Sequence, residues 1–264
     1  MSKIYALIPA AGSGSRVRAA VPKQYLCIGG RPLLYFALRP LVWHRGIEQV
    51  FVVLAPGDTH FRQFDWSEFG TRLEPLYCGG ATRAASVFNG LLAARDMIGG
   101  SDWVVVHDAA RPCLTGEALE RLLAEAGHDE AGGLLAVPVA DTLKRANRDL
   151  RVAGTEARDH LWLAQTPQMF RYRLLIEALR KVDPEAVTDE ACAIEGLGFK
   201  PRLVMGETRN LKVTFPEDLR IAERLLLAPG PAAPPARGAR ARTRGRSRAA
   251  RGRANARPRR SRRR

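Results

Sequence analysis

The sequence predicts an α/β fold in which helices cover a mostly parallel β-sheet. Continuous apolar runs rich in β-branched residues, QVFVVLA at 49–55 and WVVVH at 103–107, alternate with segments of helical apolar spacing. Such continuous runs are typical of strands covered on both faces, and their alternation with helices indicates parallel connections. The chain of 264 residues is long enough for one large domain or two small ones.

The expected strands are short apolar segments, and the clearest of them are rich in valine, isoleucine and leucine. In chain order they are Ile4–Pro9, 49–55, Leu73–Tyr77, Trp103–His107, Leu134–Val139, Arg202–Met205 and Leu211–Val213. The expected helices show apolar residues at helical spacing. They are Pro32–His44, with Pro40 as an internal irregularity, Thr82–Arg95, Thr115–Ala126, Arg171–Lys181, Thr188–Glu195 and Pro216–Leu227, with proline at its start.

Residues 141–160, DTLKRANRDLRVAGTEARDH, break this alternation because they are polar and only loosely alternating. The turn-like Asn147–Asp149 in their middle predicts a β-hairpin with little of its own to bury. Because a lone hairpin is marginally stable, we expect this arm to lie on a second subunit. A surface loop is the alternative interpretation.

The formal net charge of +15 belongs to one end of the chain. Residues 237–264 hold fourteen arginines and no acid, and without them 28 basic residues face 27 acidic ones. We therefore expect one folded domain over 1–228 and a disordered Arg/Pro/Ala-rich tail over 229–264. The tail also suggests an alternative function, in which its arginines bind the phosphates of a nucleic acid. It contains no aromatic residue for base stacking.

Other features favour a cytoplasmic protein without a membrane partner. No run of about 18 apolar residues is present to span a bilayer. The four cysteines are Cys27, Cys78, Cys113 and Cys192, and no pair has the C-x-x-C spacing. The absence of this spacing argues against a zinc site and against a disulfide framework, so we expect reduced thiols.

The stretch PAAGSGSR, residues 9–16, follows the first expected strand. Glycines allow successive backbone N–H groups to surround a phosphate. The stretch is not a dinucleotide fingerprint, because Val17 stands where the last glycine is needed, and no Walker A lysine follows. Arg16 and Lys23 flank it, which favours a polyphosphate site over an ordinary turn.

WVVVHDAARP, residues 103–112, gives a second site signal. Asp108 comes at the carboxyl end of a buried strand, where ligands bind in open α/β sheets. This carboxylate could hold a hard cation such as Mg²⁺, which bridges phosphate oxygens. His107 fits better as a packed residue at the strand end than as an acid or base.

Eight motifs occur in a fixed order: PAAGSGSR, PKQYL, GGATRAASV, HDAARP, PVADTLKR, AQTPQMF, TDEA and NLKVT. Together they resemble the 2-C-methyl-D-erythritol 4-phosphate cytidylyltransferases of the non-mevalonate isoprenoid pathway, over about residues 4–227. The resemblance implies a Rossmann-like nucleotidyltransferase sheet with a protruding β-hairpin dimerisation arm. It also implies CMP transfer from CTP, the co-substrate, to methylerythritol phosphate with release of pyrophosphate and with Mg²⁺ or another divalent cation.

The resemblance assigns roles to residues within these motifs. Arg16, Lys23 and Lys212 would be catalytic and would stabilise charge on the triphosphate. The residues implied to bind the nucleotide are Ala10, Ala11, Gly12, Gly14, Gly80, Ser86 and Asp108, of which Asp108 would also hold the metal ion. Those implied to hold the sugar phosphate are Arg111, Thr142, Arg158, Thr166 and Thr188, with Arg158 coming from the arm of a partner subunit.

Several alternatives remain at this point. Ala81 stands where the family often has an acidic residue, which could weaken CTP binding. Thr188 would also make a helix N-cap, and Thr166 before Pro167 could simply shape a turn. A ribitol 5-phosphate or other polyol-phosphate cytidylyltransferase is the nearest rival function. A regulatory nucleotide-binding module is a further one, against which the combination of Arg16, Lys23, Asp108 and Lys212 argues.

Overall fold

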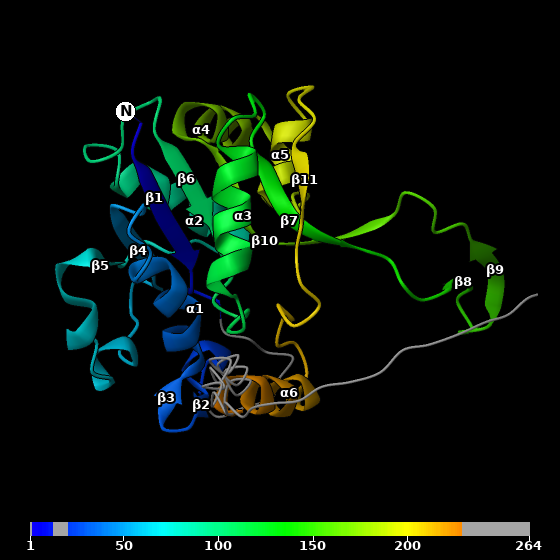
Figure 1. Cartoon of the computed structure of the whole chain (residues 1–264), viewed down its shortest axis with the longest axis horizontal. Helices are drawn as coiled ribbons and strands as arrows, with labels where there is room; N and C mark the ends of the chain where they lie inside the picture. The colour runs from blue at the N-terminus through cyan, green and yellow to red at the C-terminus, as the bar shows by residue number, and fades with distance from the viewer. Residues whose placement is uncertain (1, 13–20, 229–264) are drawn as a thin grey trace, which may run out of the picture. The chain divides into compact units, whose positions relative to one another are not determined.

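A seven-stranded sheet forms the centre of the structure, a computed structural model that describes residues 2–12 and 21–228. The strand order is β11-β7-β10-β6-β1-β4-β5 (Figure 1). The strands are β1 (Ile4–Pro9), β4 (Gln49–Val53), β5 (Leu73–Leu76), β6 (Trp103–Val106), β7 (Gly133–Pro138), β10 (Trp162–Arg171) and β11 (Arg202–Met205). β10 runs antiparallel to its neighbours β6 and β7, and the other strand pairs are parallel. The predicted α/β fold with a mostly parallel sheet is therefore confirmed.

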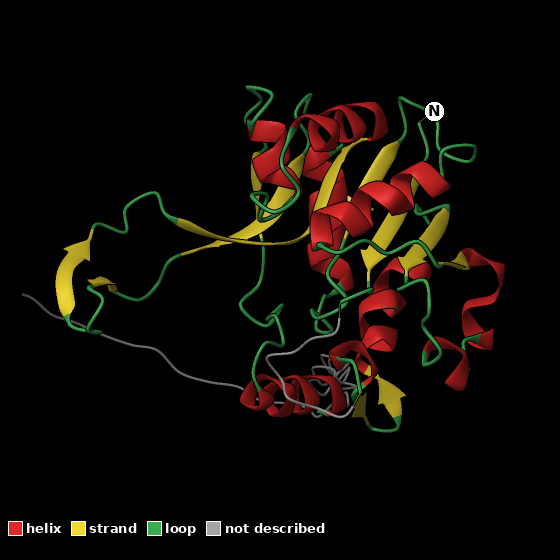
Figure 2. Cartoon of the chain, turned by 180° about the vertical axis from the view of Figure 1, so that it is seen from behind, coloured by secondary structure: helices red, strands yellow, loops and turns green. Residues whose placement is uncertain are grey.

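Helices cover both faces of this sheet (Figure 2). One face packs against α1 (Leu33–Val42) and α3 (Gly116–Ala126), and α6 (Pro216–Leu227) joins the same core through Ala222. The other packs against α2 (Arg83–Ala93), α4 (Tyr172–Lys181) and α5 (Glu190–Glu195). Along β1, Ala6 and Ile8 belong to the first core, and Tyr5 and Leu7 belong to the second. Both faces of each central strand are buried, which is why these strands are continuous apolar runs.

Short elements connect the strands and helices. They are the 3₁₀ turns η2 (Lys23–Tyr25), η3 (Phe61–Gln63) and η4 (Ser67–Arg72), and the antiparallel pair β2 (Cys27–Ile28) and β3 (Arg31–Pro32). Within residues 2–12 and 21–228, no helix is both long and apolar enough to cross a bilayer.

Two strand predictions differ from the structure. β10 was not expected, because polar residues and Pro167 interrupt it, and the register shifts between Ala164 and Gln168. The buried glutamines within it form hydrogen bonds to neighbouring segments, so they occupy core positions without an apolar pattern. The strand expected at Leu211–Val213 is wrong. That segment is a loop, in which the Val213 N–H donates to the Ala110 carbonyl oxygen (2.8 Å).

Two helices begin where the sequence predicts, next to Thr82 and Thr115, which the structure shows to be their N-caps. The Thr82 and Thr115 hydroxyl oxygens accept hydrogen bonds from the third residue along, at 3.1 Å in both helices. The expected start at Thr188 is wrong, because α5 begins at Glu190 and the Asp189 carboxylate caps it through the Cys192 N–H (2.9 Å). Thr188 therefore does not serve as the N-cap.

The expected hairpin consists of β8 (Leu143–Ala146) and β9 (Val152–Glu156), which protrude from the sheet (Figure 1). Leu150 at its turn is 89% exposed and Val152 is 67% exposed. The hairpin thus buries little within its own chain. Its role in dimerisation stays a prediction.

Residues Met1–Ala228 group into one unit of the chain. The expected disordered tail, 229–264, lies outside the described residues. The division into a catalytic domain and a tail therefore stays a prediction.

Candidate active site

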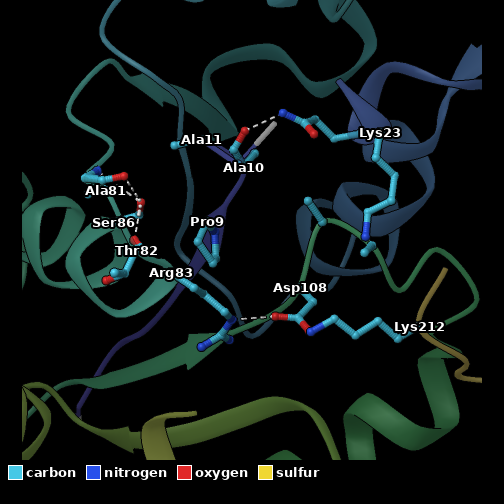
Figure 3. A pocket seen from close by; sticks show the side chains of 15 residues that line it. Pro9, Ala10, Ala11, Lys23, Ala81, Thr82, Arg83, Ser86, Asp108 and Lys212 are labelled. Carbon is cyan, nitrogen blue, oxygen red and sulfur yellow. Dashed lines mark hydrogen bonds and ion pairs between the residues drawn. The ribbon is translucent and has the colours of Figure 1, made fainter. Parts of the chain in front are cut away.

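Two adjoining cavities lie at the carboxyl ends of β1 and β6. The first has a volume of about 420 Å³ (Figure 3). Its lining includes the predicted Ala10, Ala11, Gly12, Lys23, Gly80, Ser86, Asp108 and Lys212, and also Pro9, Gln24, Ala81, Thr82, Arg83, Ala109 and Ala110. Residues 9–12 of the predicted loop, the HDAARP segment and the NLKVT segment thus line one space, although they are far apart in sequence.

The second cavity is smaller, about 110 Å³, and contains most of the predicted sugar-phosphate residues. It is lined by Arg83, Asp108, Arg111, Ala164, Gln165, Thr166, Gln168, Thr188, Asp189 and Lys212. Arg83, Asp108 and Lys212 line both cavities. A group bound in one cavity would therefore lie next to a group bound in the other.

Asp108 is the buried anion at this junction. Its Oδ1 accepts from Arg83 Nε (2.8 Å), and its Oδ2 pairs with Lys212 Nζ (2.8 Å) and more distantly with Arg111 Nε (3.8 Å). Figure 3 shows the Arg83 and Lys212 side chains reaching Asp108 from opposite sides. Burial alone would raise the pKa of Asp108, but the charges of Arg83 and Lys212 hold that pKa well below its ordinary value. The carboxylate is therefore ionised.

Arg83 is also paired with a second buried carboxylate. Its Nη1 lies 2.6 Å from Glu190 Oε1, and its Nη2 lies 3.0 Å from Glu190 Oε2. This bidentate geometry is the strongest form of an arginine–carboxylate pair. Burial would lower the pKa of Arg83, yet Glu190 and Asp108 together raise it, so the guanidinium stays charged.

Lys23 and Lys212 approach the first cavity from opposite ends of the chain. Lys23 lies in η2, where Pro22 precedes it, and its Nζ donates to the Val213 carbonyl oxygen (2.8 Å). The neighbouring Gln24 donates from Nε2 to the Ala10 carbonyl oxygen (2.6 Å) and so fixes the start of the glycine loop. These contacts join three of the sequence motifs into one wall.

The paired glycines pack too closely for any side chain. A Cβ at Gly80 would lie 2.6 Å from Ala85 Cβ, and one at Gly79 would lie 2.9 Å from the Leu54 carbonyl oxygen. The Ser86 hydroxyl oxygen accepts from the Gly80 N–H (3.0 Å) and donates to the Thr82 carbonyl oxygen (2.9 Å). Ser86 thus holds the Gly80 backbone against the first cavity.

His107 is completely buried, in agreement with its expected packing role. Its Nε2 donates to the Arg111 carbonyl oxygen (3.0 Å), so its Nδ1 accepts from the Thr166 hydroxyl (3.0 Å). The Thr166 oxygen accepts in turn from the Asp108 N–H (3.0 Å). Burial lowers the pKa of His107 to about 4, so the ring is neutral near pH 7. The chain of hydrogen bonds fixes the HDAARP loop to β10.

Some predicted site residues are not in either cavity. Thr142 and Arg158 are exposed at the base of the arm, where Arg158 donates to the Ala140 carbonyl oxygen. Gly14 and Arg16 lie outside the described residues. Arg111 lines the second cavity, but its Nη1 is bonded to the Asn210 carbonyl oxygen (2.7 Å). It therefore also holds the NLKVT segment in position.

Sequence reasoning gave no role to Gln24, Arg83 or Glu190. Arg83 lies within the GGATRAASV motif and Glu190 within the TDEA motif. The sequence signal for Glu190 was that it is an acidic residue in a motif with an expected site residue, Thr188. Their pairing over 107 positions of sequence could not be read from the chain. The described residues contain no group of three or more His, Cys, Asp or Glu side chains suited to a metal ion.

Comparison with known proteins identifies a close resemblance. The profile of the 2-C-methyl-D-erythritol 4-phosphate cytidylyltransferase family matches residues 4–228. A cytidylyltransferase of that name from Dechloromonas aromatica (strain RCB) is 58% identical over 228 residues, which are 86% of this chain and 99% of the relative. The one from Nitrosospira multiformis is 55% identical over 228 residues, 86% of this chain and 98% of the relative. A solved 4-diphosphocytidyl-2C-methyl-D-erythritol synthase aligns with a TM-score of 0.76 and 41% identity, over 86% of this chain and 99% of that one.

We predict that Gly80→Ala weakens nucleotide binding in the first cavity, because the new methyl group meets Ala85 and displaces the Gly80 backbone. The dissociation constant for CTP, measured by calorimetry, should rise about tenfold or more, which corresponds to about 1.4 kcal/mol. Gly57→Ala is the matched control, since a Cβ there meets nothing within 4 Å. Unchanged CTP affinity in Gly80→Ala would show that the nucleotide does not rest on this backbone.

Proposed function

The chain belongs to the 2-C-methyl-D-erythritol 4-phosphate cytidylyltransferase family, and from this premise we propose how its residues carry out the reaction. The enzyme is a nucleotidyltransferase that transfers CMP from CTP to 2-C-methyl-D-erythritol 4-phosphate and releases pyrophosphate. The observation that carries our proposal is the position of Asp108, Arg83 and Lys212 between two adjoining cavities. CTP binds in the larger cavity, and the phosphate of the acceptor enters through the smaller one.

The chemistry is an in-line displacement at the α-phosphorus of CTP. The nucleophile is a phosphate oxygen that is already anionic at neutral pH, so the site needs no general base. Both reactants carry negative charge, and their approach requires cations and good alignment. His107, which is neutral and has both ring nitrogens engaged in hydrogen bonds, takes no part in proton transfer.

The cationic side chains of the first cavity supply the charge. Lys23 and Lys212 stabilise the triphosphate and the transition state, and Arg16 joins them from the glycine loop. The nucleotide rests on Ala10, Ala11, Gly12, Gly14, Gly80, Ser86 and Asp108. Because Lys212 pairs with Asp108 at 40% side-chain exposure, it can exchange this contact for one with a phosphate oxygen.

The site also fits Mg²⁺. This ion is commonly held by one or two carboxylates together with substrate phosphates, so a single ionised Asp108 in the cavity is a sufficient protein ligand. Asp108 would hold the ion, which would supply charge neutralisation on the triphosphate.

The acceptor is held by residues of two subunits. Arg111, Thr166 and Thr188 line the second cavity. Thr142 and Arg158 reach the acceptor phosphate from the arm of the other subunit in a homodimer. Support comes from apolar side chains that stay exposed in one chain beside the arm, Leu163 at 56% and Met205 at 48%.

The cysteines and the tail bear on the cellular compartment of the enzyme and on its other partners. All four cysteines are free, which fits the reducing conditions of the cytoplasm. The tail at 229–264 lies beyond the family match, so we treat it as accessory to the reaction, with nucleic acid as its one alternative partner.

The first test is a pyrophosphate-release assay with CTP and Mg²⁺. We expect release with methylerythritol 4-phosphate, and background release with ribitol 5-phosphate or with no acceptor. A chain that ends at Ala228 should give the same turnover as the full chain. Release with ribitol 5-phosphate alone would overturn the acceptor assignment, and loss of turnover in the folded shorter chain would overturn the accessory role of the tail.

We predict that Lys23→Ala lowers kcat about 100-fold or more, because removing one preorganised hydrogen-bond donor from the transition state typically has an effect of that size. The unfolding temperature should change little. Lys200→Ala, at an exposed lysine outside both cavities, is the control. A near-normal kcat in Lys23→Ala would contradict the catalytic role of Lys23.

The two-subunit site predicts complementation between variants. Arg158→Ala should raise the KM for the acceptor. At an acceptor concentration far below that raised KM, mixing it in equal amounts with Lys23→Ala should restore about a quarter of wild-type turnover. Half of the random dimers are then mixed, and each mixed dimer has one complete site. Turnover that stays at the level of the separate variants would mean that Arg158 does not act on the partner's site.

A further inference from the structure

The Arg83–Glu190 pair is a buried charge arrangement that the proposed reaction does not yet use. Glu190 is 1% exposed, and the Arg83 side chain is 26% exposed. A pair of this kind costs desolvation, and an apolar pair of similar size would stabilise the fold as well or better. Its position beside the junction of the two cavities therefore points to a role in the site.

The pair has a rigid support at the Glu190 end. Gln168 in β10 donates from Nε2 to Asp189 Oδ2 (2.9 Å), and its Oε1 accepts from the Ala191 N–H (2.8 Å). The two contacts bracket Glu190 at the start of α5. The backbone on both sides of Glu190, whose carboxylate pairs with Arg83, is thus attached to the central sheet.

The two oxygens of Asp108 differ as a result. Oδ1 is held by Arg83, whose guanidinium is anchored at both of its other nitrogens by Glu190. Oδ2 is held by Lys212, a flexible and 40% exposed side chain. One oxygen has a fixed partner, and the other has a partner that can leave.

We propose that Arg83 and Glu190 act as one unit that positions Asp108, by fixing Oδ1 and turning Oδ2 toward the space where the two substrates meet. This inference rests on the proposed function, in which Asp108 contacts the reacting phosphates. Both residues are positioning residues, because they act through Asp108.

The unit also connects the walls of the two cavities. Arg83 begins α2 beside Thr82 and Ala81 of the first cavity, and Glu190 directly follows Thr188 and Asp189 of the second. Their ion pair thus fixes the acceptor wall at a constant distance from the nucleotide wall. Loss of the pair should disturb the alignment of the substrates more than the binding of either one.

The test compares Glu190→Gln, Arg83→Lys and the double variant with wild type. Outer-shell partners of catalytic groups typically contribute about 10–100-fold to activity, and we expect kcat to fall by that factor in each single variant. The dissociation constant for CTP, measured by calorimetry without acceptor, should stay within about threefold of wild type. The double variant should lose no more than the worse single variant, because the two residues act as a unit.

Matched controls separate this role from general stability. Glu195→Gln lies in the same helix and Arg95→Lys follows α2, and both side chains are exposed. Both controls should keep wild-type kcat. Arg83→Lys keeps the positive charge but cannot hold two carboxylates at once, so it also tests the idea if Glu190→Gln does not fold.

The outcomes distinguish the inference from the proposed function. Asp108→Asn serves as the reference, and wild-type turnover in it would overturn the role of Asp108 itself. If Asp108→Asn is inactive while Arg83→Lys keeps wild-type kcat, only the positioning role is wrong. A defect that appears wholly as weaker CTP binding, or losses that multiply in the double variant, would also overturn that role.

Discussion

The buried charge of Asp108 is the constraint on which the site depends. Its carboxylate draws together Arg83 from the start of α2, Arg111 from its own loop and Lys212 from the segment before α6. An ionised carboxylate in this position is tolerated only when cations and hydrogen bonds surround it. All four side chains line the second cavity, so the contacts that stabilise Asp108 also place three cations there.

The sheet was predictable because its central strands are buried on both faces and so are continuous runs of valine, isoleucine and leucine. The helices followed from apolar spacing, which placed two of their starts at Thr82 and Thr115, the residues that cap them in the structure. β10 was not predictable in this way, since its glutamines are buried by virtue of hydrogen bonds to distant segments. Leu211–Val213 shows the opposite case, because Val213 is buried in a loop whose hydrogen bonds go to Ala110 and Lys23 and not to a neighbouring strand.

The site residues were predictable as far as ordered motifs name them. Lys23, Gly80, Asp108 and Lys212 line one cavity, as their motifs implied. The motifs do not show which hydrogen bonds each of these residues makes. Thr166 has its hydroxyl proton committed to His107, and Ser86 holds the backbone of Gly80. Such roles depend on which atoms meet in space, and a single sequence carries no record of that.

The arm is attached to the sheet by two strands that pair with each other. It leaves the sheet from β7 and returns as β10, and these two strands are antiparallel neighbours that pair directly at its base, Trp162 opposite Pro138. The arm is therefore an insertion into a hairpin that is closed without it. Residues at its tip, away from Thr142 and Arg158, can therefore change in number without altering how β7 and β10 pair in the sheet.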